Sequence, residues 1–315
     1  MAAMLGIYGP LLWPPIILIA ASLLAWLVPQ RLHLQRLVEQ WAKQLQHKTH
    51  HPRRSPQQRC VAGLLAMLLI SAPLAAIMVL AMSHPLLELL LLALLLPSRN
   101  FTAAKLLQPL QQGDKEQARA QLSQWTIRDT EQLSIIGITK AGIEAQLAQR
   151  ASQFFGVVFW YLLAGLPLAL LLWLSSLLAR QWHIDKPLLQ PFGSAAFYLA
   201  SLMMIPVNGL LGVSLSCYGS VLQPWRLRYQ LRGSWERRHQ QWLQLCLACS
   251  LGIQLSGPWM LQGKRLERPK LGPTVQAQPA HLIRAQRMLN YAQTLWLLLP
   301  LLSSVAIAWL WHQGQ

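Results

Sequence analysis

The chain has 315 residues, of which 54% are hydrophobic and only 12% are charged, and its mean hydropathy is +0.32. This composition excludes an ordinary soluble domain and indicates an integral membrane protein. The net charge of +17 would by itself also fit a nucleic-acid-binding protein. The positions of the charges must therefore distinguish these two classes.

Six apolar stretches are candidates for membrane-spanning helices, because a bilayer core of about 30 Å needs roughly 20 apolar residues in a helix. Five are uncharged, and the third contains Glu88, is shorter and is expected to form a tight hairpin with the stretch before it. We predict an all-α integral membrane protein with about six transmembrane helices and helical cytoplasmic loops. The stretches are 5–28, 61–82, 85–97, 154–178, 195–218 and 291–311.

Most Lys and Arg residues lie between these spans on one side of the membrane. Of the 27 cations, 25 fall in segments 29–60, 98–153 and 219–290, which six spans place together. By the positive-inside rule these basic loops are cytoplasmic and both termini face outward. We expect a multi-pass protein of the bacterial inner (plasma) membrane, with membrane lipid and not nucleic acid as its partner.

The charge pattern also divides the chain into five segments, alternately membrane-embedded and cytoplasmic. These are the N-terminal spans with their basic loop (1–97), a cytoplasmic helical segment (98–153), the central spans (154–218), a basic cytoplasmic segment (219–290) and the C-terminal span (291–315).

Residues 30–46 have apolar residues at helical spacing with cations between them. This pattern predicts an amphipathic helix, which either lies on the cytoplasmic membrane face or forms a solvated linker. The basic tract 48–56 follows. Its neighbouring His50 and His51 have no nearby carboxylate or Cys, so we expect a solvated loop and no metal site.

The polar segment 102–153 predicts two or three helices. Asp114 precedes one helix, and Thr130 or Ser134 can cap the next. Between the helices, Arg128-Asp129-Thr130 forms a turn, where residue type alone makes Asp129 a helix N-cap. By the same reasoning, Glu144 is a surface charge.

Two polar features interrupt the later apolar stretches. Pro206 and Asn208 in the fifth span indicate either a kinked helix packed in a bundle, which we favour, or the lining of a polar cavity. Cys246 and Cys249 have the spacing of a redox or zinc pair. Their apolar neighbours and the lack of a second pair favour buried thiols in a helix.

The last basic segment combines aromatic residues with a glycine-rich turn. Residues 225–238 interleave Trp and Tyr with Arg, which is typical of an interfacial belt. The turn 252–258, which includes Gln254 and Gly257, could bring backbone N–H groups to an anion. No nucleotide-binding glycine motif is present in the sequence.

Three blocks of residues resemble one known family, the membrane-bound adenosylcobinamide-phosphate synthases, called CobD/CbiB. The resemblance covers the chain from about residue 100 onward and, more faintly, the first spans. The first block is Gly113-Asp114, Ala118-Arg119, Leu122-Ser123, Arg128-Asp129-Thr130 and Leu133; the second is Ile138, Lys140-Ala141, Glu144 and 159–167; the third is Gly252-Ile253-Gln254-Leu255, Gly257-Pro258, Arg265, Pro269 and Gly272.

The resemblance implies a role in cobalamin biosynthesis. The implied reaction joins a propionate of adenosylcobyric acid to an aminopropanol or its phosphate in an amide bond, with ATP and magnesium. It also implies a corrinoid intermediate and other cobalamin-assembly enzymes as partners. The sequence leaves the catalytic residues unassigned. The candidates for substrate contacts are Arg128, Asp129, Thr130, Glu144, Gln254 and Gly257.

The chain departs from the family pattern at several carboxylates. Residues 147–153 read Leu-Ala-Gln-Arg-Ala-Ser-Gln, where family members carry Ala-Glu-Asn-x-x-Asp-Gly, and Pro273 replaces a later Asp. The catalytic motif is therefore degenerate. A second hypothesis follows: a non-enzymatic inner-membrane regulatory or interaction protein, similar to the related AmpE type.

Overall fold

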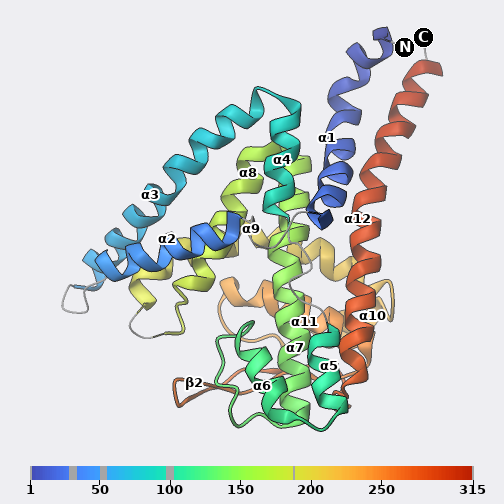
Figure 1. Cartoon of the computed structure of the whole chain (residues 1–315). Coiled ribbons are helices and arrows are strands. Elements are labelled where there is room, and N and C mark those ends of the chain that lie inside the picture. The colour runs from blue at the N-terminus through green and yellow to red at the C-terminus, as the bar shows by residue number, and fades with distance from the viewer. Residues whose placement is uncertain (1, 28–33, 50–54, 97–102, 187–188, 314–315) are drawn as a thin grey trace. The chain divides into compact units, whose positions relative to one another are not determined.

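A computed structural model describes residues 2–27, 34–49, 55–96, 103–186 and 189–313 (Figure 1). The chain divides into two compact units. The first comprises residues 1–98, 152–200 and 293–315, and the second comprises residues 99–151 and 201–292.

The first unit is helical. In it α8 packs against the four N-terminal helices, and α4 packs against α1 and α3. Ser83 and His84 join α3 to α4, which confirms the predicted tight hairpin. The helices are α1 (Ala2–Leu27), α2 (Leu34–Thr49), α3 (Pro56–Met82), α4 (Pro85–Leu95), the π-helix η2 (Ala151–Phe155), α8 (Gly156–Gln181), the start of α9 (Gln190–Ser216) and the end of α12 (Ala280–Gln313).

Local sequence explains where α3 begins. Ser55 and Gln58 form a capping box, in which each side chain accepts a hydrogen bond from the other residue's backbone N–H. Pro56 occupies the first helical position, where its missing N–H costs nothing.

The amphipathic helix predicted at 30–46 is α2, although residues 30–33 lie outside the described residues. It buries Val38 and Ala42 and packs against α3 and α8. The carbonyl of Ala42 also accepts a hydrogen bond from the buried indole of Trp182 at 3.3 Å. The inner face of α2 is therefore part of the helical unit itself. The histidines of the following loop lie outside the described residues.

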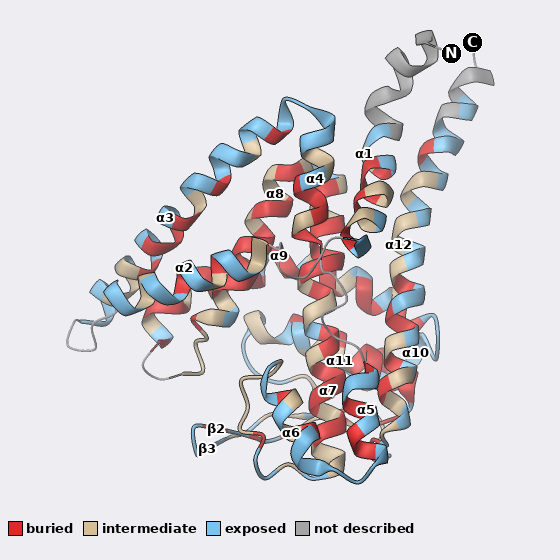
Figure 2. Ribbon diagram, in the orientation of Figure 1, coloured by how far each residue is buried: buried red, intermediate tan, exposed pale blue. Residues whose placement is uncertain are grey.

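Within the described residues, four helical stretches are long and apolar enough to cross a membrane: Pro56–Met82, Ile135–Gln181, Gln190–Ser216 and Ala280–Ile307. Apolar side chains on α3 are exposed along most of its length (Figure 2), among them Leu64, Leu68 and Leu80. Large exposed apolar surfaces of this kind identify an integral membrane protein. The other two predicted spans coincide with shorter apolar helices, Trp13–Leu27 and Pro85–Leu95. The count of about six remains a prediction.

The second unit contains shorter helices and two small antiparallel ribbons. In the first ribbon β1 pairs with β4, and in the second β2 pairs with β3. The elements are α5 (Ala103–Gln111), α6 (Lys115–Ser123), α7 (Ile135–Arg150), α10 (Leu222–Arg226), the 3₁₀-helix η3 (Arg228–Gln230), α11 (Trp235–Leu251), β1 (Leu255–Ser256), β2 (Trp259–Leu261), β3 (Lys264–Leu266), β4 (Lys270–Leu271) and the remaining parts of α9 and α12.

The ribbons are an addition to the helices that the sequence predicts, and they lie in the basic segment 219–290. Gly252 ends α11 in the left-handed conformation, with φ of 71°, which glycine adopts at little cost. The strands that follow have only two or three residues each. Such short strands show no readable alternation of polar and apolar residues.

The predicted helices of 102–153 are confirmed as α5, α6 and α7. The Asp114 side chain caps α6 by accepting a hydrogen bond from the Gln117 N–H at 2.9 Å. Of the two candidate caps for α7, Ser134 fills the role, and its hydroxyl accepts from the Gly137 N–H at 3.2 Å. Side-chain capping of this kind satisfies backbone donors that the helix leaves free.

The two cysteines of α11 are buried thiols, as predicted. Cys246 is fully buried, and Cys249 is 5% exposed. Burial raises the pKa of Cys246 to about 12 and that of Cys249 to about 11. Both thiols are therefore protonated at neutral pH, the state in which Cys is a poor nucleophile and metal ligand.

The position of Asn208 supports the prediction that the kinked fifth span packs in a bundle. It is 2% exposed, and its amide nitrogen lies 2.7 Å from Nδ1 of His239 on α11. The contact therefore joins α9 to α11 inside the second unit. Burial lowers the pKa of His239 to about 4, so the imidazole is neutral at physiological pH.

The His239 environment predicts a pH-dependent stability. Since the folded-state pKa of about 4 lies below the ordinary value of 6.5, stability is complete above pH 6.5 and falls as the pH drops toward 4. The total loss is up to about 3 kcal/mol, since each pKa unit corresponds to roughly 1.4 kcal/mol. Thermal unfolding in detergent from pH 7.5 to 4 measures it. His239→Gln should make the stability depend less on pH. An equally steep loss of stability in this variant would show that other titrating groups cause it.

Gly193 and Gly209, both on α9, provide a matched pair for a packing test. A Cβ at Gly193 would clash with the carbonyl oxygen of Trp182, whereas one at Gly209 would meet nothing within 4 Å. Gly193→Ala should lower the free energy of unfolding by about 2 kcal/mol or more. Gly209→Ala should raise it by up to about 1 kcal/mol through helix propensity. Equal melting temperatures for the two variants would contradict the close approach at Gly193.

Candidate functional site

The ion pair between Arg128 and Glu144 forms the centre of the candidate site. Glu144 lies on α7 with its side chain only 5% exposed, and its Oε2 accepts a hydrogen bond from Nη2 of Arg128. Its other oxygen, Oε1, accepts from the backbone N–H of Ser256 at 2.8 Å. The expectation that Glu144 is a surface charge is therefore wrong, because Arg128 from the loop before α7 and the Ser256 N–H from the turn after α11 cover it.

The hydrogen bond from Ser256 to Glu144 also shows which anion the turn 252–258 contacts. The sequence indicates that backbone N–H groups there could bind an anion, and in the structure Ser256 donates to the protein's own Glu144. Gly257 follows with φ of 112°, a conformation accessible to glycine, and is buried near the Lys270 side chain.

Asp129 holds the β2–β3 hairpin. Its Oδ1 accepts from the Gln262 N–H at 3.1 Å and its Oδ2 from the Gly263 N–H at 2.9 Å. Its own N–H donates to the Met260 carbonyl at 3.0 Å. The interpretation of Asp129 as a helix N-cap is wrong, since the hairpin, remote in sequence, supplies the donors. The next residue, Thr130, is buried.

Trp259 lies against two arginines. The guanidinium carbon of Arg128 is 4.4 Å from its ring centroid and that of Arg268 is 4.0 Å from it. Cations at this distance from an indole face are held by its quadrupole, more strongly where water is excluded. The Trp259 ring thus gathers two positive charges beside the buried carboxylate.

Two buried donors of this cluster have no acceptor among the residues that the structure describes. These are Nε of Arg128 and the indole nitrogen Nε1 of Trp259. A buried donor without an acceptor costs about 1–3 kcal/mol, and such atoms in native proteins are commonly satisfied by a ligand, ion or water. An anionic oxygen is the acceptor that best suits a guanidinium.

Lys140 and Gln254 extend the cluster. Lys140 lies one helical turn before Glu144 on α7, and its Nζ donates to Oε1 of Gln254 at 3.4 Å. Lys140 also interacts electrostatically with Glu144 and with Lys270 on β4.

Four cations belong to this cluster: Arg128 and Lys140 interact with Glu144, Arg268 lies against Trp259, and Lys270 lies near Lys140. This surplus of positive charge suits an anionic ligand.

The structure brings together Arg128, Glu144 and Gln254 of the predicted residues, and it places Asp129, Thr130 and Gly257 in the loops that support them. Sequence reasoning missed Trp259, Arg268, Lys270 and the Ser256 N–H. Their positions depend on the pairing of the strands in the two ribbons, which the sequence did not reveal. Lys140 could have been found, because its spacing of four residues from Glu144 places both on one helix face.

The carboxylates of the site fit magnesium poorly. Mg²⁺ prefers oxygen ligands in octahedral geometry, but all four oxygens of Asp129 and Glu144 accept hydrogen bonds from the protein. Among the described residues, no group of three His, Cys, Asp or Glu side chains is placed to hold a metal ion. The cluster instead suits an anion that brings its own oxygens.

The segment that departs from the resemblance is partly buried and carries a single charge. Residues 147–153 end α7 and begin the π-helix η2, and Leu147, Ala151 and Gln153 are buried. The Gln153 amide donates to Gln35 on α2 at 3.2 Å. π-Helical turns often mark functional positions, but here the buried Gln153 is held by another helix of the protein.

The Arg128–Glu144 pair predicts a strong coupling energy. Glu144→Met should destabilise the protein by about 3–5 kcal/mol, because it leaves Arg128 buried without its counterion. Arg128→Met/Glu144→Met should recover most of this loss, since an apolar pair of similar volume needs no counterion. A double-mutant cycle of unfolding in detergent measures the coupling. Additive losses would show that the two side chains do not stabilise one another.

Comparison with known proteins identifies similar sequences. The family described as CobD/Cbib protein matches residues 18–289. Cobalamin biosynthesis protein CobD of Chromobacterium violaceum is 29% identical over 202 residues, covering 63% of this chain and 64% of the relative. The protein of the same name from Stutzerimonas stutzeri is 28% identical over 202 residues, covering 63% and 66%.

Cobalamin biosynthesis protein CbiB of Salmonella typhimurium is 26% identical over 179 residues, covering 54% of this chain and 55% of the relative. In all three cases the chain spans less than two thirds of the relative's length. No solved structure matches the chain.

Proposed function

The chain belongs to the CobD/CbiB family, and from this membership we propose that it acts in cobalamin (vitamin B12) biosynthesis at the bacterial inner membrane. The proposed reaction forms an amide bond between a propionate carboxyl of adenosylcobyric acid and the amine of an aminopropanol or its phosphate, driven by ATP. The basic segments face the cytoplasm, where ATP is present. Relatives named for cobalamin biosynthesis support this role.

The observation that carries the proposal is the pair of buried donors without acceptors, Arg128 Nε and Trp259 Nε1, inside a cluster of cations. The corrinoid propionate, ATP and an aminopropanol phosphate all present anionic oxygens. Each could accept hydrogen bonds from these donors. These oriented donors support the proposal that such a substrate binds here.

The surrounding residues have separable roles in this proposal. Glu144 orients Arg128, and Trp259 holds Arg128 and Arg268 by cation–π contacts. Lys140 and Lys270 add positive charge that would offset the negative charge of a transferred phosphoryl group. No role is assigned to Asp129 beyond holding the hairpin that carries Trp259. Magnesium takes part in no step derived from these residues.

Complementation tests the proposal directly. A bacterial strain that lacks its own synthase, supplied with adenosylcobyric acid, should make cobalamin when it expresses this chain. The membrane fraction is checked for the expressed protein. Lack of growth despite normal expression would reject the enzymatic function for that host and amine.

Arg268 and Arg265 provide a matched pair of variants. Arg268 lies against Trp259, whereas Arg265 is exposed and pairs with Glu267 at 2.8 Å. In the complementing strain, Arg268→Gln should lower the rate of cobalamin formation by roughly tenfold, as expected for loss of about 1.4 kcal/mol of charge stabilisation. Arg265→Gln should leave it unchanged. Equal effects would assign the loss to general surface charge.

A specific observation favours a second candidate, a non-enzymatic regulatory or interaction protein similar to the AmpE type. The carboxylates Asp129 and Glu144 are both occupied by hydrogen bonds within the protein, and residues 147–153 contain no carboxylate. Corrinoid binding separates the candidates. Equilibrium dialysis of the detergent-solubilised protein with adenosylcobyric acid should show saturable binding for the first candidate and none for the second.

A further inference from the structure

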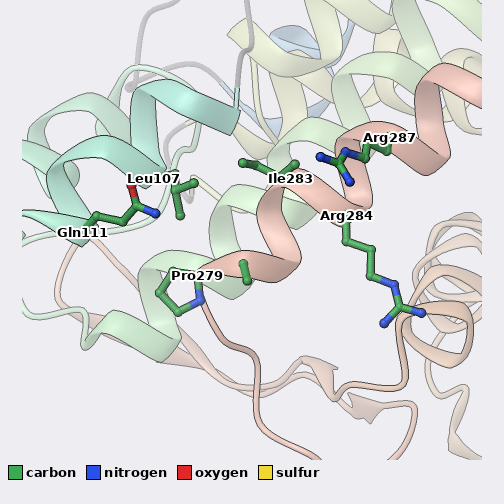
Figure 3. Close-up of a pocket in the computed structure, with 7 residues that line it drawn as sticks. Leu107, Gln111, Pro279, Ile283, Arg284 and Arg287 are labelled. Atoms are coloured by element: carbon green, nitrogen blue, oxygen red, sulfur yellow. The ribbon is translucent and has the colours of Figure 1, made fainter.

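A pocket outside the Glu144 site lies between α5 and the beginning of α12 (Figure 3). Its volume is 430 Å³, and it belongs entirely to the second unit. Figure 3 shows Leu107 and Gln111 on α5, and Ile283, Arg284 and Arg287 on α12. The lining combines an apolar part, Leu107, Pro279 and Ile283, with Arg284 and Arg287, whose side chains leave α12 in different directions (Figure 3).

The walls of this pocket are held in place. The backbone N–H of Ala103, at the start of α5, donates to Oε1 of Gln286 on α12 at 2.7 Å. Behind the pocket, Leu106 and Leu282 are fully buried and pack on Gly142 of α7, where a Cβ would lie 2.7 and 2.9 Å from their methyl groups. The two helices are therefore fixed against α7, and the pocket is formed before any ligand binds.

The charge of the pocket is unbalanced. Arg284 and Arg287 are exposed, and neither belongs to an ion pair among the described residues. No acidic residue lies in the first turn of α12, whose N-terminal end is the positive end of the helix dipole. The positive charges of Arg284 and Arg287 are repelled by this end of the dipole. An anion bound to the two arginines would relieve the repulsion.

The position of the pocket along α12 indicates the source of the anion. The same helix continues into the apolar stretch 291–311, where Tyr291, Leu298 and Leu299 are exposed. At 1.5 Å per residue, Arg287 lies about 6 Å and Arg284 about 10 Å before Tyr291 along the helix. The polar layer of a bilayer is roughly 5–8 Å thick on each side. The arginines therefore fall at about the level of lipid phosphates.

We propose that this pocket binds the phosphate headgroup of an anionic phospholipid. Arg284 and Arg287 bind the phosphate, and Leu107, Pro279 and Ile283 contact the glycerol and the first acyl carbons. A soluble phosphate could use the arginines but would gain nothing from the apolar part. The site is separate from the Glu144 cluster, so the inference holds whether or not the chain catalyses amide formation.

Native mass spectrometry of the full chain in detergent tests the proposal, with phosphatidylglycerol and phosphatidylcholine added in equal amounts. The wild type should retain phosphatidylglycerol in preference to phosphatidylcholine. Arg284→Gln/Arg287→Gln should weaken phosphatidylglycerol binding by roughly thirtyfold, the effect of two arginines near a lipid surface. Both side chains are exposed, so the folded state should be retained, and the melting temperature verifies it.

The matched control removes two other exposed cations. Lys264→Gln/Arg265→Gln deletes the same charge from β3, where both side chains are exposed, and it should leave lipid retention unchanged. An equal loss in this control would assign binding to general surface charge and overturn the proposal. Competition by glycerol 3-phosphate at the lipid's own concentration would also overturn it, in favour of a soluble phosphate. Absence of preference for phosphatidylglycerol in the wild type would reject the site outright.

Discussion

The buried carboxylate of Glu144 is the interaction on which the second unit depends. It joins three segments that are far apart in the chain: the loop with Arg128, helix α7 and the turn at Ser256. A buried carboxylate is tolerated only when its oxygens are compensated, here by a guanidinium and a backbone N–H. Because both compensating groups lie in non-helical segments, the same contact that satisfies Glu144 also positions the loops around it.

The electrostatic character of the site follows from this arrangement. The carboxylates Asp129 and Glu144 accept hydrogen bonds from internal donors, whereas Arg268 lies against the ring of Trp259 and Lys140 lies near the positive charge of Lys270. The site consequently presents positive charge and unpaired donors. This arrangement suits an anionic ligand, for chemistry and for sensing alike.

The two proposed anion sites differ in their surroundings. At Trp259 the donors are buried and stacked on an aromatic ring, which suits a defined ligand with fixed geometry. At Arg284 and Arg287 the cations are exposed beside an apolar wall and a long apolar helix, which suits a lipid. The combination is compatible with an enzyme or a sensor that works at the membrane surface.

The sequence by itself determined the membrane class, the helices of 102–153 and the cap at Asp114, because hydropathy, periodicity and capping are local properties. It also identified Arg128, Glu144 and Gln254 as candidates through their resemblance to a family. It could not assign Asp129 to a hairpin or Glu144 to the interior, because their partners, at Gly263 and Ser256, lie more than a hundred residues away. Only the tertiary structure brought those backbone donors, and the ring of Trp259, to these charges.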